Sequence, residues 1–105
     1  MSRALTFEEI LEIIRNHKKE LRERFAVKRI GVFGSFVKGT ATKGSDVDFF
    51  VEFRIEELTF DKFLALIDFL EALTGRKVDI ITRDGLKTIR VPQVKEDIER
   101  NIIYV

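Results

Sequence analysis

The sequence predicts a small α/β fold, in which one mixed β-sheet packs against helices, and it predicts residues 1–105 as a single domain. Three observations favour this fold. A length of 105 residues suits one compact domain with its own core. Apolar residues make up 45% of the chain and include ten phenylalanines. Segments with helical spacing of apolar residues alternate with short β-branched runs, as in helices packed on a sheet.

The first expected element is one long helix over residues 7–24. Thr6 and Glu9 make a capping-box pattern at its start. Apolar residues then keep roughly helical spacing, at Phe7, Ile10, Leu11, Ile14, Leu21 and Phe25. Cations fall toward the C-terminal end of this helix, where they suit the helix dipole: Lys18, Lys19, Arg22 and Arg24. We interpret these cations, and the lone His17, as solvated.

Two strands are expected next, over residues 27–33 and 47–53. The first is a β-rich run that ends at Gly34, and a short helical turn is expected directly after that glycine. The second run is almost continuously apolar, which indicates a strand covered on both faces.

A second long helix is expected after Thr59, which could cap it. Its apolar stripe runs from Phe60 to Leu73, and Gly75 is placed to end it. The phenylalanines of this region are predicted to lie in the core or on a partner surface: Phe49, Phe50, Phe53, Phe60, Phe63 and Phe69.

Residues 77–82 form a third expected strand. Pro92 suits the first turn of a last helix that runs through about Arg100. The apolar tail, residues 102–105, should pack against the rest of the chain. For Tyr104 we weigh a packing role against a role as a target of self-modification, and favour packing.

The stretch from Gly34 to Asp48 carries the strongest functional signal. Gly34 and Ser35 follow one strand, where free backbone N–H groups can bind anions and glycine permits close approach. Ser35 adds a hydroxyl donor to phosphate, or serves as a helix N-cap; the two readings are compatible. Gly39 would let the turn end tightly. Lys38 and Lys43 are near enough in sequence to neutralise phosphate charge.

Asp46 and Asp48 open the second strand. Residues at i and i+2 of a strand point to one face, with Cα atoms roughly 6–7 Å apart. Proteins rarely place two carboxylates so close without a cation or a proton between them. Asp79 is the best candidate for a third carboxylate, because a charge inside an apolar strand is costly without a partner. Simpler alternatives are solvated acids at Asp46 and Asp48, and an ion pair of Asp79 with Arg76 or Lys77.

Three carboxylates could hold two Mg²⁺ ions for an in-line displacement. One ion, held by Asp46, Asp48 and Asp79, would activate an attacking hydroxyl. The other, held by Asp46 and Asp48, would bind a triphosphate and stabilise the leaving pyrophosphate. Asp79 could also act as the base for the hydroxyl proton.

These residues resemble the signature of the DNA polymerase β-like nucleotidyltransferase superfamily, and the length is similar to its minimal nucleotidyltransferase branch. The resemblance covers about residues 25–105. It implies the palm-like nucleotidyltransferase fold and Mg²⁺-dependent transfer of a nucleoside monophosphate, with ATP as the default substrate. The matching metal and phosphate positions are Gly34, Ser35, Asp46, Asp48 and Asp79. Gly39 and Ser45 lie within the signature and are expected to bind nucleotide, and Lys38 stands where many relatives have Arg. Phe36 is a second departure from the family pattern.

The resemblance also implies a partner, a HEPN ribonuclease toxin that this chain silences as an antitoxin. It would do so by adding AMP to a toxin tyrosine, or by binding alone on an inactive nucleotidyltransferase fold. Transfer of nucleotides to nucleic acid is the least favoured alternative. A homodimer, or a hetero-oligomer with the partner, is compatible with so small a domain.

Composition excludes several other classes. The chain has no cysteine, so a disulfide framework and a zinc–thiolate site are impossible. A net charge of +1 gives no overall bias toward nucleic acid, so stable binding to it is not expected. No apolar run is long enough to span a membrane, and the first residues lack an apolar signal region. A cytoplasmic location is therefore expected.

Overall fold

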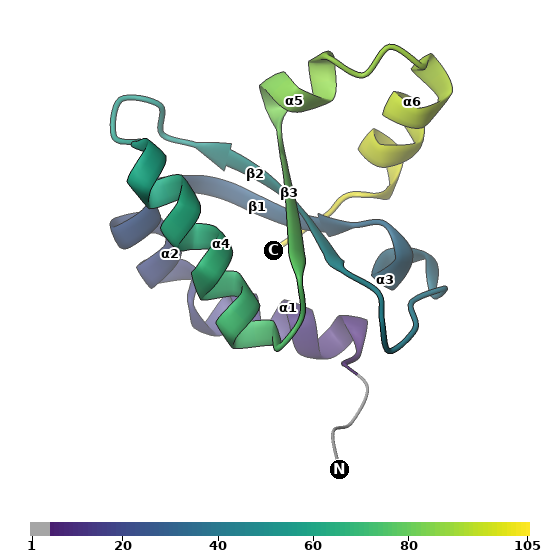
Figure 1. Cartoon of the computed structure of the whole chain (residues 1–105), viewed down its shortest axis with the longest axis horizontal. Coiled ribbons are helices and arrows are strands. Elements are labelled where there is room, and N and C mark those ends of the chain that lie inside the picture. Colours follow the sequence, from purple (N-terminus) through teal and green to yellow (C-terminus); the bar gives the residue numbers. More distant parts are fainter. Residues whose placement is uncertain (1–4) are drawn as a thin grey trace.

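A computed structural model describes residues 5–105 (Figure 1). Its elements, in chain order, are α1 (Phe7–Asn16), α2 (Lys18–Phe25), β1 (Val27–Phe33), α3 (Ser35–Lys38), β2 (Val47–Phe53), α4 (Phe60–Thr74), β3 (Val78–Thr82), α5 (Arg83–Lys87), α6 (Pro92–Asn101) and β4 (Ile103–Tyr104). Residues 1–4 lie outside the described residues. They make up most of the N-terminal segment in which no signal peptide is expected.

The strands form one four-stranded mixed sheet in the order β3-β2-β1-β4. β1 is antiparallel to both of its neighbours, β2 and β4, whereas β2 and β3 are parallel. The predicted α/β class with a mixed sheet is therefore confirmed.

Helices cover the two faces of the sheet unequally. On one face, α1, α2 and α4 pack together over the strands (Figure 1). The alternate β2 residues Val47, Phe49 and Val51 are fully buried beneath them. On the second face, Phe50 is buried in a smaller cluster with Leu86 of α5 and with Ile102. Because residues two apart in a strand share a face, Asp48 lies on this second, less covered face.

The predicted start of α1 and the predicted start and end of α4 are confirmed, because their capping groups are in place. The Thr6 hydroxyl accepts a hydrogen bond from the Glu9 N–H at 3.1 Å, and the Glu9 carboxylate accepts one from the Thr6 N–H at 3.2 Å. Thr59 caps α4 through the Lys62 N–H at 3.1 Å. Gly75 ends α4 with a φ of +69°, a left-handed conformation that glycine adopts without strain.

The prediction of one helix over residues 7–24 was wrong, because the chain breaks at His17. The imidazole Nδ1 of His17 lies 2.7 Å from the carbonyl oxygen of Ile13, and its ring packs edge-on against Phe69 of α4. The predicted solvated His17 is thus a half-buried junction residue. The break also places Lys18 and Lys19 in the first turn of α2, not toward the end of a long helix.

Two elements were not predicted. α5 begins directly after β3, where the Thr82 hydroxyl accepts a hydrogen bond from the Gly85 N–H at 3.0 Å. The apolar tail forms β4, which pairs with Gly31 and Val32.

Gly31 makes room for this last strand. A Cβ at Gly31 would lie 2.6 Å from a methyl group of Ile102, so a larger residue would displace the tail. Tyr104 and Phe50, which both lie opposite Gly31, bring their rings to 6.1 Å across it. The Arg29 guanidinium lies 3.5 Å from the Tyr104 ring centroid. These contacts support the packing role predicted for Tyr104.

No helix among residues 5–105 has the length and apolar character needed to cross a membrane.

Candidate active site

Asp48 and Asp79 are brought together by the parallel pairing of β2 with β3. They are direct register partners, between Val47–Val78 on one side and Phe49–Ile80 on the other. Directly paired residues of neighbouring strands point to the same face of a sheet. Two of the three predicted carboxylates therefore stand side by side on the less covered face.

The charges of the three aspartates act on one another. The pKa of the half-buried Asp48 is raised from 3.8 to about 6, first by burial and then by the negative charges of Asp79 and Asp46. Among the described residues none of the three forms an ion pair with a Lys or Arg. The alternative weighed for Asp79, an ion pair with Arg76 or Lys77, is therefore absent, and the cluster has no cation of its own within residues 5–105.

Asp46 lies directly before β2, whose bounds agree with the strand predicted over residues 47–53. β2 begins at Val47, whose N–H donates to the Lys77 carbonyl oxygen at 2.9 Å. Asp46 is exposed and follows a turn closed by a hydrogen bond from the Ser45 N–H to the Thr42 carbonyl oxygen at 3.1 Å. Asp46 therefore approaches Asp48 from a loop.

Arg76 holds this loop, a role that the sequence did not indicate. Its guanidinium donates hydrogen bonds to the carbonyl oxygens of Thr42, at 3.3 Å, and of Lys43. Ser45, predicted to bind nucleotide, is engaged in the same turn, since its hydroxyl accepts a hydrogen bond from the Thr42 N–H at 2.8 Å. The structure therefore shows Ser45 shaping the loop, and its binding of nucleotide stays a prediction.

Gly34 is fitted against Asp48. A Cβ at Gly34 would lie 2.2 Å from an Asp48 carboxylate oxygen, and its φ of +79° is in the region that favours glycine. Phe33, just before it, is the β1 register partner of Asp48. Only glycine lets the turn after β1 come this close to the carboxylate.

The predicted short helix after Gly34 is α3, and its first turn is left uncapped. Gly34 itself is the N-cap residue, and no side chain accepts a hydrogen bond there. Ser35 is the first helical residue, so it does not take the N-cap role considered for it. Its half-buried hydroxyl has no hydrogen-bond partner among residues 5–105. Gly39 ends the turn with a φ of +75°, as predicted. Phe36 is buried in the main core cluster and anchors α3.

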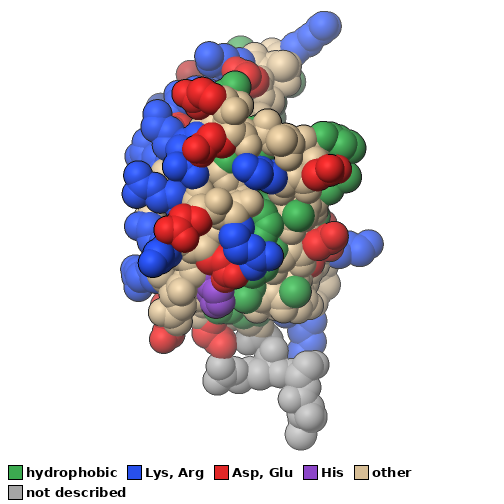
Figure 2. Space-filling view, turned by 90° about the vertical axis from the view of Figure 1, so that its left-hand side faces the viewer, with side chains coloured by type: hydrophobic (Ala, Val, Ile, Leu, Met, Phe, Trp, Pro, Cys, Tyr) green, Lys and Arg blue, Asp and Glu red, His purple; other side chains and the backbone are tan. Residues whose placement is uncertain are grey.

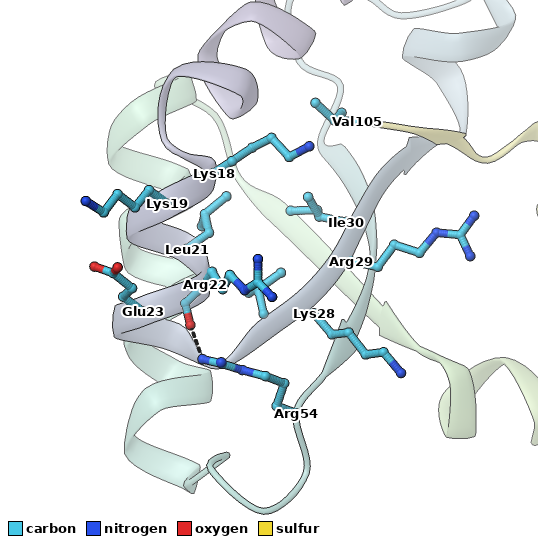
Figure 3. A pocket seen from close by; sticks show the side chains of 11 residues that line it. Lys18, Lys19, Leu21, Arg22, Glu23, Lys28, Arg29, Ile30, Arg54 and Val105 are labelled. Carbon is cyan, nitrogen blue, oxygen red and sulfur yellow. Dashed lines mark hydrogen bonds between the residues drawn. The ribbon is translucent and has the colours of Figure 1, made fainter.

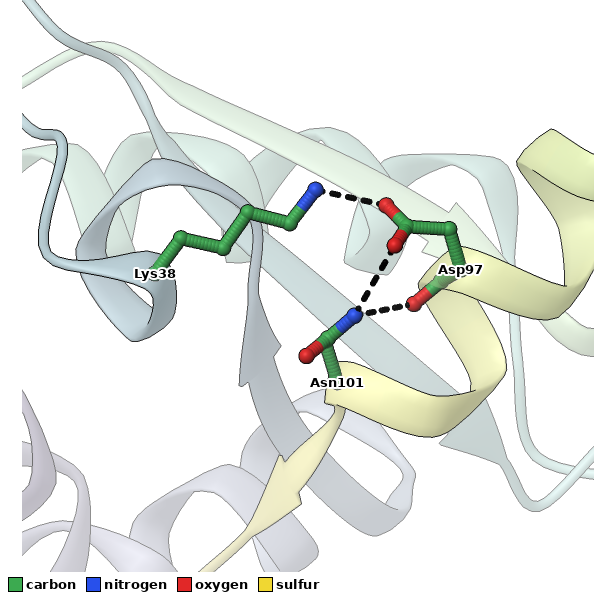
Figure 4. Close-up of polar contacts among 3 residues, drawn as sticks. All are labelled: Lys38, Asp97 and Asn101. Atoms are coloured by element: carbon green, nitrogen blue, oxygen red, sulfur yellow. Dashed lines mark hydrogen bonds and ion pairs between the residues drawn. The ribbon is translucent and has the colours of Figure 1, made fainter.

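Lys38, the predicted phosphate ligand, is held by α6 in this structure. Its ammonium lies 2.6 Å from a carboxylate oxygen of Asp97 (Figure 4). The Asn101 side-chain amide donates to the Asp97 carbonyl oxygen at 2.6 Å and to its carboxylate at 3.2 Å. Both charged side chains are about half exposed. A phosphate group would therefore compete with Asp97 for Lys38.

The donor set fits a hard divalent cation. Carboxylate oxygens are the ligands that Mg²⁺ prefers, and a cation would relieve the repulsion that raises the Asp48 pKa. Among residues 5–105 no three such side chains are already gathered into a ready-made cluster. Asp46, Asp48 and Asp79 therefore stay predicted ligands, and Asp46 would have to draw in from its exposed loop.

The fold and this site define a class of enzyme. An uncapped glycine–serine turn lies against a carboxylate pair on an open sheet face, which suits transfer of a phosphorus group from a nucleoside triphosphate.

Comparisons with known proteins agree with this class. A family model described as the nucleotidyltransferase domain matches residues 14–105. The chain is 47% identical over 101 residues to the protein adenylyltransferase MntA of Thermococcus cleftensis. The aligned region covers 96% of this chain and 97% of that protein. A solved minimal nucleotidyltransferase is 30% identical with a TM-score of 0.71, covering 97% of this chain and 98% of the other. A toxin–antitoxin crystal structure with AMP-PNP shares the fold, with a TM-score of 0.59 at 19% identity over 95% of this chain and 72% of that one.

The chain belongs to the nucleotidyltransferase domain family, and its resemblance to the minimal nucleotidyltransferases is confirmed. It is a nucleotidyltransferase by fold and by family.

Proposed function

We propose that this nucleotidyltransferase transfers AMP from ATP to a hydroxyl group of another protein. The pairing of Asp48 with Asp79 beside Gly34 carries the proposal, because it places carboxylates next to a turn that can receive phosphates. The similarity to a protein adenylyltransferase over nearly the whole of both chains supports AMP as the group and a protein as the acceptor.

Each residue has a distinct task in this proposal. Asp46, Asp48 and Asp79 would hold Mg²⁺, which neutralises the charge of the triphosphate and favours ionisation of the attacking hydroxyl. The free amides after Gly34 and the Ser35 hydroxyl would bind phosphate oxygens. Lys38 would exchange Asp97 for the triphosphate and offset its charge. Asp79, which is exposed, would accept the proton of the acceptor hydroxyl.

We further propose that the chain is an antitoxin whose acceptor is a HEPN ribonuclease toxin. The fold shared with the protein of a toxin–antitoxin crystal structure supports a toxin as partner. The HEPN class is our inference from the family resemblance.

A second candidate is an antitoxin that blocks its partner sterically, without transfer. The contact of Lys38 with Asp97 and the loop position of Asp46 favour it, because both leave the site short of the arrangement that transfer requires.

Intact-mass spectrometry of the partner, after incubation with this protein, Mg²⁺ and ATP, separates the two. We expect the partner to gain one or more AMP units with wild type and with Asp68→Asn, an exposed aspartate of α4. With Asp48→Asn it should gain none. No gain with wild type, while the two proteins still form a stable complex, would establish the steric antitoxin instead.

A further inference from the structure

A cavity of about 590 Å³ lies between α2 and β1, away from the candidate active site. None of the proposed phosphate or metal residues lines it. Most of the charged side chains that line it are basic: Lys18, Lys19, Arg22, Lys28, Arg29 and Arg54, beside one acidic side chain, Glu23.

The cations that face this cavity come from α2 and from Arg54, which follows β2, whereas the Lys28 and Arg29 side chains extend from β1 away from α2 (Figure 3). Lys18 and Arg22 extend from α2 toward β1, whereas Lys19 and Glu23 point away from the opening (Figure 3). Arg54 closes one end, where its guanidinium donates to the Arg22 carbonyl oxygen. Seen from the side on which α2 lies, Lys and Arg side chains gather along one edge of the molecule (Figure 2).

These cations are not neutralised by the protein itself. Lys18, Arg22 and Lys28 make no ion pair within residues 5–105, and Arg54 alone pairs with a carboxylate, that of Glu57 at 2.8 Å. Arg24, on the same helix, differs from them because it forms an ion pair with Glu20. Lys18 and Arg22 are four residues apart on one helix, a spacing at which like charges repel. The folded chain therefore keeps a repulsive group of cations around an empty volume.

The floor between the cations is apolar. Leu21, Val27 and Ile30 are buried there, and Val105 lies at one end, where its N–H donates to the Ile30 carbonyl oxygen at 3.0 Å. A hydrophobic floor lowers the effective dielectric around a bound anion, so each charged contact at the rim is stronger than in open water.

We propose that this cavity binds a short polyphosphate chain, either free or carried on a nucleotide. The density of charge selects this chemistry. Acidic side chains on one face of an extended peptide lie roughly 6–7 Å apart, so few of them fit into the cavity. Linked phosphates share bridging oxygens and bring several charges into the same length. Ammonium and guanidinium groups together are the usual protein ligands of phosphate. The proposal is independent of AMP transfer.

Titration calorimetry with sodium tripolyphosphate, in EDTA and at low salt, tests the site. Without Mg²⁺ the carboxylates of the candidate active site repel phosphate, so binding under these conditions reports on the cavity. We expect one site on wild type. Lys18→Gln with Arg22→Gln should weaken it at least about tenfold, because each variant removes a charge-assisted hydrogen-bond donor. Arg90→Gln with Lys95→Gln, an equal loss of charge outside the cavity, should change the affinity less than about twofold.

ATP and an eight-residue oligouridylate, titrated in the same way, identify the source of the phosphates. ATP binding that is lost in the cavity variant and kept in the control supports a nucleotide-borne chain, and tripolyphosphate binding alone supports a free one.

An equal loss of affinity in the two double variants would overturn the proposal, since it would show that net charge alone causes the effect. Absence of tripolyphosphate binding would also overturn it, as would binding of the oligouridylate alone, which would assign the cavity to nucleic acid. AMP transfer by the cavity variant should stay at the wild-type rate, so failure of either proposal is recognisable separately.

Discussion

At the scale of single residues, Asp48 is held in a position that costs free energy. It is half-buried, it faces Asp79 directly, and Asp46 adds a third negative charge nearby. The turn at Gly34 lies so near its carboxylate that a Cβ there would be 2.2 Å from one of the oxygens. A carboxyl group whose pKa is raised on folding destabilises the folded state whenever it is ionised. A side chain that lowers the stability of the folded protein in this way is expected at a functional site.

We predict that Asp48→Asn stabilises the protein in the absence of divalent cations. The pKa of Asp48 rises from 3.8 to about 6 on folding, so the destabilisation is full above about pH 6 and disappears as pH falls toward about 4. After allowance for solvent screening, we expect about 1–2 kcal/mol at pH 8. Chemical denaturation in EDTA across this pH range measures it. Asp68→Asn is the control, and a gain for Asp48→Asn that does not vary with pH would contradict the assigned cause.

Most of the candidate site residues could be predicted from the sequence, because their types and spacing are local features. Gly34, Ser35, Asp46 and Asp48 lie within one short stretch, and a glycine–serine turn before paired acids is recognisable there. The direct pairing of Asp79 with Asp48 could not be predicted, because register between strands depends on packing of the intervening helix. The role of Arg76 in holding the loop gave no signal in the sequence, since its acceptors are backbone carbonyls, which every residue carries.

At the scale of elements, the errors have two physical sources. The break at His17 depends on a side-chain contact with the carbonyl of Ile13 and on Phe69, far along the chain, and neither is visible in apolar periodicity. The strand β4 is only two residues long, and its strand character comes from pairing with Gly31. The longer helices and the three longer strands follow their own caps and periodicity, so they were predictable.

The loop before β2 provides a prediction at this scale. Arg76→Ala should free the turn at residues 42–45 and so misplace Asp46, while costing only about 1 kcal/mol of stability because the hydrogen bonds are largely exposed. We expect faster hydrogen exchange at the Ser45 amide and a lower kcat/KM for AMP transfer, both measured beside Arg90→Ala. Unchanged exchange at Ser45 would show that Arg76 does not hold the loop.

At the scale of the whole molecule, opposite charges are kept on separate parts of the surface. Asp48 and Asp79 lie on the sheet face opposite α1, α2 and α4, and the cations that line the cavity lie between α2 and β1. The net charge of +1, the sum of 19 Lys and Arg against 18 Asp and Glu, does not show this separation. Sequence composition reports the sum of charges, whereas the fold decides where each sign is concentrated.

Mg²⁺ should raise the thermal stability of the molecule as a unit. Binding at ten times its dissociation constant contributes about 1.4 kcal/mol, which is about 5–10 °C in Tm for a domain of this size. Differential scanning calorimetry with and without Mg²⁺ measures this shift. Asp79→Asn should reduce it, and Asp68→Asn should not. A single transition that moves as a whole would agree with the predicted single domain, whereas a shift of equal size in both variants would argue against metal binding at the aspartates.

Gly31 also affects the fluorescence of the protein, through the surroundings of Tyr104. The chain contains one tyrosine and no tryptophan, so its intrinsic emission comes from Tyr104. Because Gly31 has no side chain, that ring rests against Phe50 and under the Arg29 guanidinium at the edge of the sheet. The fluorescence of the unmodified protein is therefore a built-in reporter of whether the last strand is docked. Comparison with helical circular dichroism would distinguish local fraying of the tail from loss of the whole fold.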